Sequence, residues 1–389
     1  MGEAGDSGRT ILCVVGTRPE AVKMAPIVLR LRRAVGLRAR LAATGQHREL
    51  LARALADFGL AADVDLDLMR PGQTLAKITA RALVGLDGTI ADERPDFVLA
   101  QGDTTTVLAA ALASFYRGVP FGHVEAGLRT GHPRRPFPEE KNRVLAGHLA
   151  DLHFAPTPSS RVNLLREGID EGTIHVTGNP GIDALGLIAG LDRPLPVAPS
   201  TDRMVLVTAH RRENFGPPMV AICEAILDII AADPRLCVVF PVHPNPAVRA
   251  VVAEVLSDHP RVHRIEPVGH ADFVALMRAS FLILTDSGGV QEEGPSLGRP
   301  VLVLRDETER PEAVASGSVR LVGPHRLAIV EAVRALATDP DLYRRSAAVA
   351  NPYGDGWAAE RIVRVLMTRF GLEHPPCPEG FRPDWPPDD

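Results

Sequence analysis

Short apolar runs alternate with segments of helical spacing along almost the whole chain. Seven runs have the length and character of buried strands: ILCVV at 11–15, DFVLA at 96–100, VPFGHV at 119–124, MVLVT at 204–208, LCVVF at 236–240, FLILT at 281–285 and VLVL at 301–304. Such alternation is typical of βαβ units, in which parallel strands are covered by helices on both faces. The sequence therefore predicts an α/β fold with doubly wound, Rossmann-like sheets.

The length of 389 residues exceeds what one hydrophobic core usually organises, so two domains are expected. A proline-rich stretch without periodicity, residues 191–201, is interpreted as the linker between them. We predict one α/β domain over 9–190 and another over 200–355. A helix over 356–371 is expected to return to the first domain, and a mobile tail is expected over 372–389.

Composition excludes several classes of protein. The net charge of −5 carries no signature of nucleic-acid binding. No apolar run approaches the roughly 20 residues that span a bilayer, and the first residues lack a signal-peptide pattern, so we expect a cytoplasmic protein. The four cysteines have no CxxC spacing, which indicates neither a disulfide framework nor a zinc site.

Polar clusters directly follow six of the apolar runs. They are GTRPE, QGDTTT, EAGLRTG, AHRREN, VHPNP and DSGG. Ligands of open α/β sheets bind outside the carboxyl ends of the strands, where these clusters lie. The pattern predicts one large ligand between the two domains.

Two of the clusters have the character of anion sites. In GTRPEAVK, Arg18 and Lys23 lie near the start of a helix, where an anion such as pyrophosphate is favoured, although solvated charges would give the same pattern. In DSGGVQEE, Ser287, Gly288 and Gly289 open a helix with free N–H groups, and a plain N-cap serine is the alternative. No GxGxxG motif occurs, which argues against a nicotinamide cofactor.

Acidic residues and one histidine at the strand ends are candidates for proton transfer. Asp103 either caps the next helix or acts in catalysis, and Glu125 directly follows a strand. Glu139 and Glu140 form an acidic pair, of which Glu140 is interpreted as a solvated helix-face residue. His210 has either a structural or a catalytic role. Converging carboxylates should raise at least one carboxyl pKa toward neutrality.

The motif series resembles one enzyme family. GTRPEAVKMAPIV, TGQHREL, GDTTTVLAAALASFYRGVPFGHVEAGLRTG, PFPEEKNR, TAHRREN, PVHPNP, LILTDSGGVQEE and RPVLVLRDETERPEAV are similar, in this order, to the motifs of non-hydrolysing UDP-N-acetylglucosamine 2-epimerases. The likeness runs from residue 11 to about residue 365. It implies a two-domain glycosyltransferase-B-like fold whose domains face a cleft, a homodimer, and a UDP-linked acetamido sugar as substrate, without a metal or another cofactor.

The same resemblance implies roles for individual residues. The positions that match acid-base or sugar-contacting residues are Asp103, Glu125, Glu139 and His210. Those that match substrate-binding residues are Arg18, Lys23, Arg143, Ser287, Gly288, Gly289, Glu293 and Arg310. Gln46, His47, Gln73 and His243 resemble the region where some relatives bind a second substrate molecule, and the chain departs from that pattern at Glu49 and Gly72.

The reaction implied is reversible inversion at C2 of UDP-N-acetylglucosamine, giving UDP-N-acetylmannosamine for glycan or cell-surface polysaccharide synthesis. The route implied is anti elimination of UDP to 2-acetamidoglucal, followed by re-addition. The sequence is also compatible with three other enzymes: a hydrolysing 2-epimerase, an epimerase of a related UDP-acetamido sugar, and a glycosyltransferase of the same fold.

Overall fold

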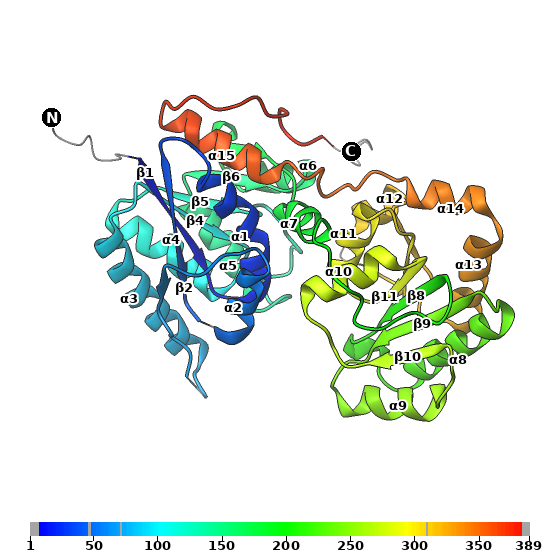
Figure 1. Ribbon diagram of the computed structural model, residues 1–389. Helices are drawn as coiled ribbons and strands as arrows, with labels where there is room; N and C mark the ends of the chain where they lie inside the picture. The colour runs from blue at the N-terminus through cyan, green and yellow to red at the C-terminus, as the bar shows by residue number, and fades with distance from the viewer. Residues whose placement is uncertain (1–7, 46–47, 71, 309, 383–389) are drawn as a thin grey trace. The chain divides into compact units, whose positions relative to one another are not determined.

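The computed structural model describes residues 8–45, 48–70, 72–308 and 310–382. The chain divides into two compact units: the first runs up to Leu187 and resumes at Tyr353, and the second comprises Ile188–Pro352. Each unit contains one parallel β-sheet with helices on both faces (Figure 1). The predicted α/β fold class with two Rossmann-like sheets is confirmed.

The sheet of the first unit has seven strands in the order β3-β2-β1-β4-β5-β6-β7. The strands are β1 (Arg9–Val15), β2 (Leu37–Ala43), β3 (Val64–Asp65), β4 (Phe97–Gln101), β5 (Phe121–Val124), β6 (Leu152–Ala155) and β7 (Ile174–Val176). The helices are α1 (Arg18–Leu31), α2 (Arg48–Ala56), α3 (Leu75–Glu93), α4 (Thr105–Arg117), α5 (Glu139–Leu149), α6 (Pro158–Arg166), α7 (Pro180–Ala189) and α15 (Ala358–Arg369). A 3-10 turn, η1, covers Glu171–Thr173.

Alternate side chains of β1 enter two different cores. Ile11 and Cys13 pack with α1, α2 and α15, whereas Leu12 and Val14 pack with α3 and α4. Burial on both faces explains why this strand is a continuous apolar run without polar alternation.

The sheet of the second unit has six strands in the order β10-β9-β8-β11-β12-β13. The strands are β8 (Arg203–Thr208), β9 (Leu236–Pro241), β10 (Val262–Ile265), β11 (Leu282–Thr285), β12 (Val301–Val303) and β13 (Val319–Leu321). The helices are α8 (Pro217–Ala232), α9 (Pro246–Leu256), α10 (His270–Ala279), α11 (Gly288–Ser296), α12 (Pro311–Ala315), α13 (Arg326–Thr338) and α14 (Pro340–Ala347), with a 3-10 turn, η2, at Arg212–Asn214.

The last helix, α15, belongs to the first unit and packs beside α1 (Figure 1). Its buried residues Ile362 and Leu366 join the core that covers one face of the first sheet. Asp183 of α7 receives hydrogen bonds from the first backbone amides of α15, 2.8 Å from the Ala359 nitrogen. The helix is therefore tied to the first unit by both packing and capping.

The segment after α15 differs from the expected mobile tail as far as residue 382. Phe381 is 5% exposed, and its backbone N–H donates to the Val176 carbonyl at 2.9 Å. Arg361 also donates to the Glu379 carbonyl at 2.9 Å. A buried aromatic side chain and these hydrogen bonds hold the segment in spite of its proline content.

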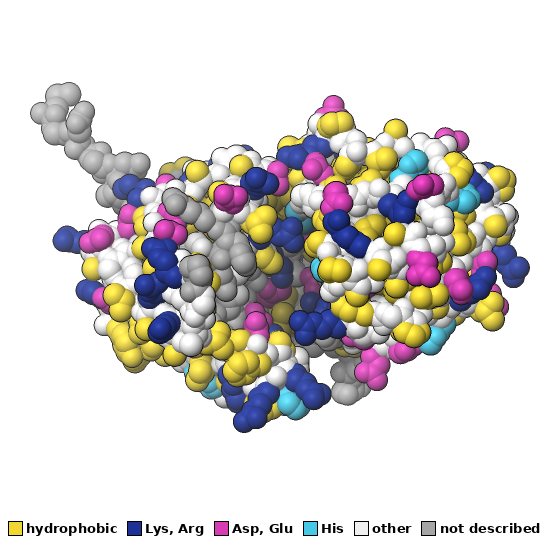
Figure 2. Space-filling model, turned by 90° about the horizontal axis from the view of Figure 1, so that it is seen from below, with side chains coloured by type: hydrophobic (Ala, Val, Ile, Leu, Met, Phe, Trp, Pro, Cys, Tyr) yellow, Lys and Arg dark blue, Asp and Glu magenta, His cyan; other side chains and the backbone are white. Residues whose placement is uncertain are grey.

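Acidic and basic side chains are mixed over the face of the molecule that Figure 2 shows. Among the described residues, no helix combines the length and apolar character that crossing a bilayer requires.

Candidate active site

Both sheets reverse their strand order at an inner pair of strands. In the first unit the reversal lies between β1 and β4, and in the second between β8 and β11. Ligands of doubly wound sheets bind at this switch point, beyond the carboxyl ends of the strands. The GTRPE and QGDTTT segments follow the first pair, and AHRREN and DSGG follow the second.

The loop after β1 is fixed before α1 begins. Thr17 is the N-cap of α1, and with Glu20 it forms a capping box. A Cβ atom at Gly16 would collide with the Thr106 hydroxyl and lie 2.7 Å from the Thr44 hydroxyl, so only glycine fits there. Arg18 follows with an exposed side chain that makes no hydrogen bond to a described residue.

Glu125 is held by two side chains at the end of β5. The Lys23 Nζ from α1 lies 2.5 Å from the Glu125 Oε1, and the Gln101 amide donates to the Glu125 Oε2. Glu125 is 9% exposed. Since a buried carboxylate is costly without partners, one cation and one amide account for its stability in this position.

The backbone of Glu125 is strained as well. Its φ of 64° lies in the left-handed region, which side chains other than glycine, asparagine and aspartate rarely adopt. Such strain costs on the order of 1–3 kcal/mol and is concentrated at functional sites. The conformation turns the chain sharply at the end of β5 and is consistent with a functional role for this residue.

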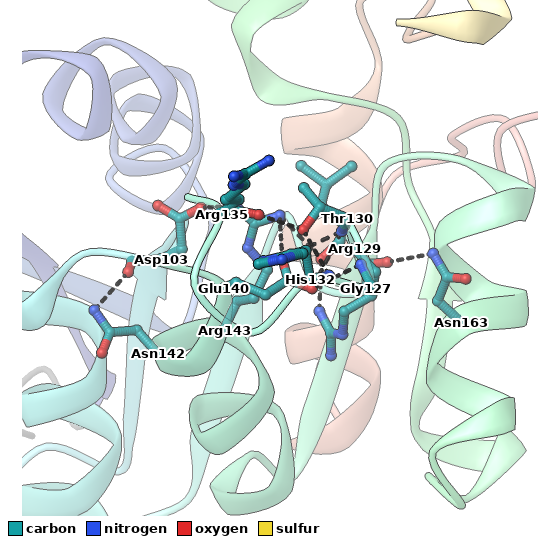
Figure 3. A network of polar contacts seen from close by, with 12 residues as sticks. Asp103, Gly127, Arg129, Thr130, His132, Arg135, Glu140, Asn142, Arg143 and Asn163 are labelled. Carbon is teal, nitrogen blue, oxygen red and sulfur yellow. Dashed lines mark hydrogen bonds and ion pairs between the residues drawn. The ribbon is translucent and has the colours of Figure 1, made fainter. Parts of the chain in front are cut away.

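Asp103 forms a second carboxylate-cation pair at the same edge (Figure 3). Arg143 of α5 lies 2.5 Å from the Asp103 carboxylate, and the Asn142 side-chain amide donates to the Asp103 carbonyl at 2.9 Å. Thr104, not Asp103, is the N-cap residue of α4. Asp103 therefore does not cap α4, which was one of the two roles that the sequence left open for it.

The two acidic residues at the start of α5, Glu139 and Glu140, have different surroundings. Glu140 is 4% exposed, and it accepts hydrogen bonds from the backbone N–H groups of Thr130 and Gly131, each at 3.1 Å (Figure 3). The interpretation of Glu140 as a solvated helix-face residue is wrong, because its carboxylate anchors the preceding loop. Glu139 is half-buried and makes no hydrogen bond or ion pair with a described residue.

In the second unit a fully buried carboxylate organises the loop after β8. Asp286 accepts hydrogen bonds from the backbone N–H groups of His210 and Arg211, both at 2.8 Å, and from the Asn214 amide at 3.0 Å. The His210 ring stacks on His243 with 6.0 Å between ring centroids. Burial lowers the pKa of His210, which favours a neutral imidazole near pH 7.

The N-terminus of α11 has the features of an anion site. Ser287 is its N-cap residue but makes no side-chain capping bond. A Cβ atom at Gly288 would lie 3.7 Å from the Arg211 Nη2 and 3.8 Å from the Arg310 Nη2, so two guanidinium groups flank the free N–H groups of the helix. Helix N-termini and arginine both favour phosphate. Gly289 follows in the first turn.

The remaining predicted residues that the structure describes are Glu293, Gln73 and His243, and of these His243 stacks on His210. Glu293 of α11 lies 3.3 Å from the His270 Nε2. Gln73 accepts the backbone N–H of Arg70 at 2.6 Å in a loop of the first unit. His243 belongs to the second unit. Gln46 and His47 lie outside the described residues.

Four residues that lie beside the predicted residues or their loops were not among the predicted site residues. They are Glu20, Gln101, Arg211 and Asp286. Burial raises the pKa of Glu20 to about 7. Glu20 and Asp286 stand within the quoted motifs, but their burial depends on loop packing. Among the described residues, no three His, Cys, Asp or Glu side chains are grouped so as to hold a metal ion.

Two parallel-sheet units with polar sites at their switch points define an enzyme of the glycosyltransferase-B-like α/β class. A family model described as UDP-N-acetylglucosamine 2-epimerase matches residues 29–367. The chain belongs to the UDP-N-acetylglucosamine 2-epimerase family, a family of isomerases.

Individual relatives are similar over nearly their full lengths. A UDP-N-acetylglucosamine 2-epimerase of Yersinia pestis is 50% identical over 367 residues, which cover 92% of this chain and 98% of the relative. One of Bacillus subtilis is 49% identical, with coverage of 93% and 96%. The crystal structure of a UDP-GlcNAc 2-epimerase from Neisseria meningitidis bound to UDP-GlcNAc aligns with a TM-score of 0.80 and 45% identity, covering 92% of this chain and all of that one.

Proposed function

We propose that this enzyme interconverts UDP-N-acetylglucosamine and UDP-N-acetylmannosamine by inverting the sugar at C2. The observation that carries the proposal is the pair of carboxylates, Asp103 and Glu125, at the ends of neighbouring strands, each held by one cation. Paired acids of this kind can take and return protons while their positions stay fixed. The relatives named for the same reaction support it.

The chemistry explains why the diphosphate must leave. The C2 hydrogen adjoins an amide nitrogen and no carbonyl group, so a protein base cannot remove it directly near pH 7. When the C1–O bond to UDP breaks, its electron pair departs with UDP, and the C2–H electrons form the C1=C2 bond as a base accepts the proton. In the reverse step, C2 receives a proton on the opposite face, and a UDP oxygen rebonds to C1.

The second unit is proposed to hold the leaving group. The guanidinium groups of Arg211 and Arg310 beside Gly288 would neutralise charge that grows on the diphosphate as the bond breaks. Three further polar groups are proposed to contact the diphosphate: the Ser287 hydroxyl, the Gly289 N–H group and His210. Glu293 is proposed to accept hydrogen bonds from the ribose hydroxyls.

The first unit is proposed to supply the proton-transfer groups. Asp103, Glu125 and Glu139 are the candidates for base and acid, together with His210 of the second unit. Arg18, Lys23 and Arg143 are proposed to bind the substrate, and Lys23 and Arg143 also hold Glu125 and Asp103 in place. The homodimer and the second substrate site stay predictions.

One experiment separates the possible activities. Purified protein is incubated with UDP-N-acetylglucosamine in deuterated water and followed by NMR. The proposal predicts the manno isomer with deuterium at C2 and little free UDP. Free N-acetylmannosamine with stoichiometric UDP would indicate a hydrolysing epimerase. Unchanged substrate would reject the proposal in favour of a glycosyltransferase or a different UDP-acetamido sugar.

A further inference from the structure

Glu20 is a buried carboxylate that contacts two loops at once. It is 2% exposed and lies in the first turn of α1. Its Oε2 accepts the backbone N–H groups of Gly16 at 2.5 Å and Thr17 at 2.9 Å, and its Oε1 accepts the Thr104 hydroxyl at 2.5 Å. A capping box accounts for the Thr17 contact but not for the other two.

The two loops carry proposed site residues. Gly16 and Thr17 immediately precede Arg18, and Thr104 immediately follows Asp103. The strands that lead into these loops, β1 and β4, are hydrogen-bonded neighbours at the switch point. A single carboxylate thus joins the loop after β1 to the loop after β4, one residue away from each candidate group.

We propose that Glu20 is a positioning residue, which fixes Asp103 and Arg18 relative to each other without touching the substrate. This inference rests on the proposed epimerisation. Small displacements of a catalytic group, on the order of 1 Å, can lower a rate about 100-fold. A residue that sets the spacing of two loops therefore affects turnover more than it affects binding of UDP.

The contacts of Glu20 do not require its negative charge. Burial raises its pKa to about 7, and Asp103, the charged group facing it, adds to this effect. In the neutral form one oxygen still accepts both backbone N–H groups, while the protonated oxygen donates to the Thr104 hydroxyl. A glutamine can make the same three contacts, whereas an alanine can make none.

The test compares Glu20→Gln, Glu20→Ala and Thr104→Val by steady-state kinetics of epimerisation and by UDP titration calorimetry. We expect Glu20→Gln to keep kcat within about 3-fold and Glu20→Ala to lose about 100-fold, with UDP affinity within about 3-fold in both. Thr104→Val removes the link between the loops but leaves the capping box, and its kcat should fall about 10-fold. If Glu20→Ala does not fold, the kcat of Thr104→Val provides the test.

The matched control is Asp96→Asn. Asp96 accepts the Thr10 N–H at 2.8 Å at the opposite, amino edge of the sheet, and its replacement should leave kcat unchanged. Equal losses in Glu20→Gln and Glu20→Ala would overturn the inference, because the charge itself would then be needed. Unchanged kcat in Thr104→Val would also overturn it.

A second measurement separates this inference from the proposed function. If the wild-type enzyme does not epimerise UDP-N-acetylglucosamine, the proposed function fails, and the link between the loops is still measured by amide hydrogen exchange. Thr104→Val should accelerate exchange in the segments at 16–20 and 101–106, relative to Asp96→Asn. Unchanged exchange in both segments would show that Glu20 does not join the loops.

Discussion

The Lys23 ammonium lies 2.5 Å from the Glu125 Oε1, so one ion pair ties the first turns of α1 to the residue that directly follows β5. The Glu125 side chain is 8% exposed, and the Lys23 side chain is 23% exposed. In such surroundings the loss of one partner leaves a largely buried charge, which is far costlier than the loss of a surface pair.

Lys23→Met should lower kcat by about 100-fold or more, because Glu125 would keep only a neutral amide donor. The measurement is the initial rate of epimerisation at saturating substrate. Lys77→Met is the control, since Lys77 is an exposed lysine on α3 of the same unit. A full rate in Lys23→Met would show that the ion pair has no part in turnover.

Asp103→Asn should retain UDP binding and lose deuterium exchange at C2 by at least about 100-fold, since the amide cannot take up the proton. Calorimetry with UDP and NMR in deuterated water measure the two properties. Asp87→Asn is matched to it, because Asp87 also pairs with an arginine, Arg117, but on the exposed faces of α3 and α4. Exchange that persists in Asp103→Asn would remove Asp103 from the mechanism.

Arg211→Met should weaken UDP binding about 10-fold to 100-fold, because a charge-assisted hydrogen bond contributes roughly 1.5–3 kcal/mol. Arg211 is preferred to Arg310 for this test, since Arg310 also pairs with Glu292 at 2.5 Å and its loss would unpair that acid. The dissociation constant for UDP is measured by calorimetry. Arg320→Met, at an exposed position on β13, should bind UDP like the wild type.

Replacing the two acids at the start of α5 one at a time should separate catalysis from stability. Glu140→Ala removes the acceptor for two loop N–H groups and should lower the free energy of unfolding by about 1–3 kcal/mol. Glu139→Ala should change that free energy by less than about 0.5 kcal/mol, and it should lower kcat strongly. Denaturant titration measures the free energy of unfolding of both variants, and steady-state kinetics measures their kcat. A large loss of stability in Glu139→Ala together with a large loss of kcat in Glu140→Ala would exchange the two assignments.

Asp183 predicts a specific pH dependence of stability. Burial raises its pKa to about 6, and its carboxylate accepts the N–H groups that open α15. A raised folded-state pKa means that the folded state holds the proton more tightly, so stability from this group falls as pH rises from about 4 to about 6. Asp183→Asn should flatten the curve of unfolding free energy against pH in that interval. A curve of unchanged slope would contradict the raised pKa.

The central strands could be predicted because burial on both faces leaves a continuous apolar run. All seven predicted runs overlap strands in the structure. The strand β2 and the edge strands β3 and β10 are less apolar. RTILCVV of β1 contrasts with LRARLAA of β2, whose arginines at 38 and 40 interrupt the run. Their identity depends on pairing with a neighbour, which residue type alone does not encode.

The candidate site was predictable where a motif combines residue type with position at a strand end. Asp103 and Glu125 are of this kind. The roles of Glu140 and Asp286 were not predictable, because each is a carboxylate that accepts backbone N–H groups of a loop, and any sequence can supply such groups. The spacing of Thr17 and Glu20 is that of a capping box, but it does not mark the contact of Glu20 with the Thr104 hydroxyl.

The position of α15 in the first unit makes the second unit an insertion within the first. During synthesis, residues 188–352 leave the ribosome before the helix that completes the core around β1 is available. The second unit can therefore fold while the first still exposes the apolar face that Ile362 and Leu366 later cover. Premature termination after residue 352 would yield a chain in which both sheets have all their strands but the core on one face of the first sheet lacks α15.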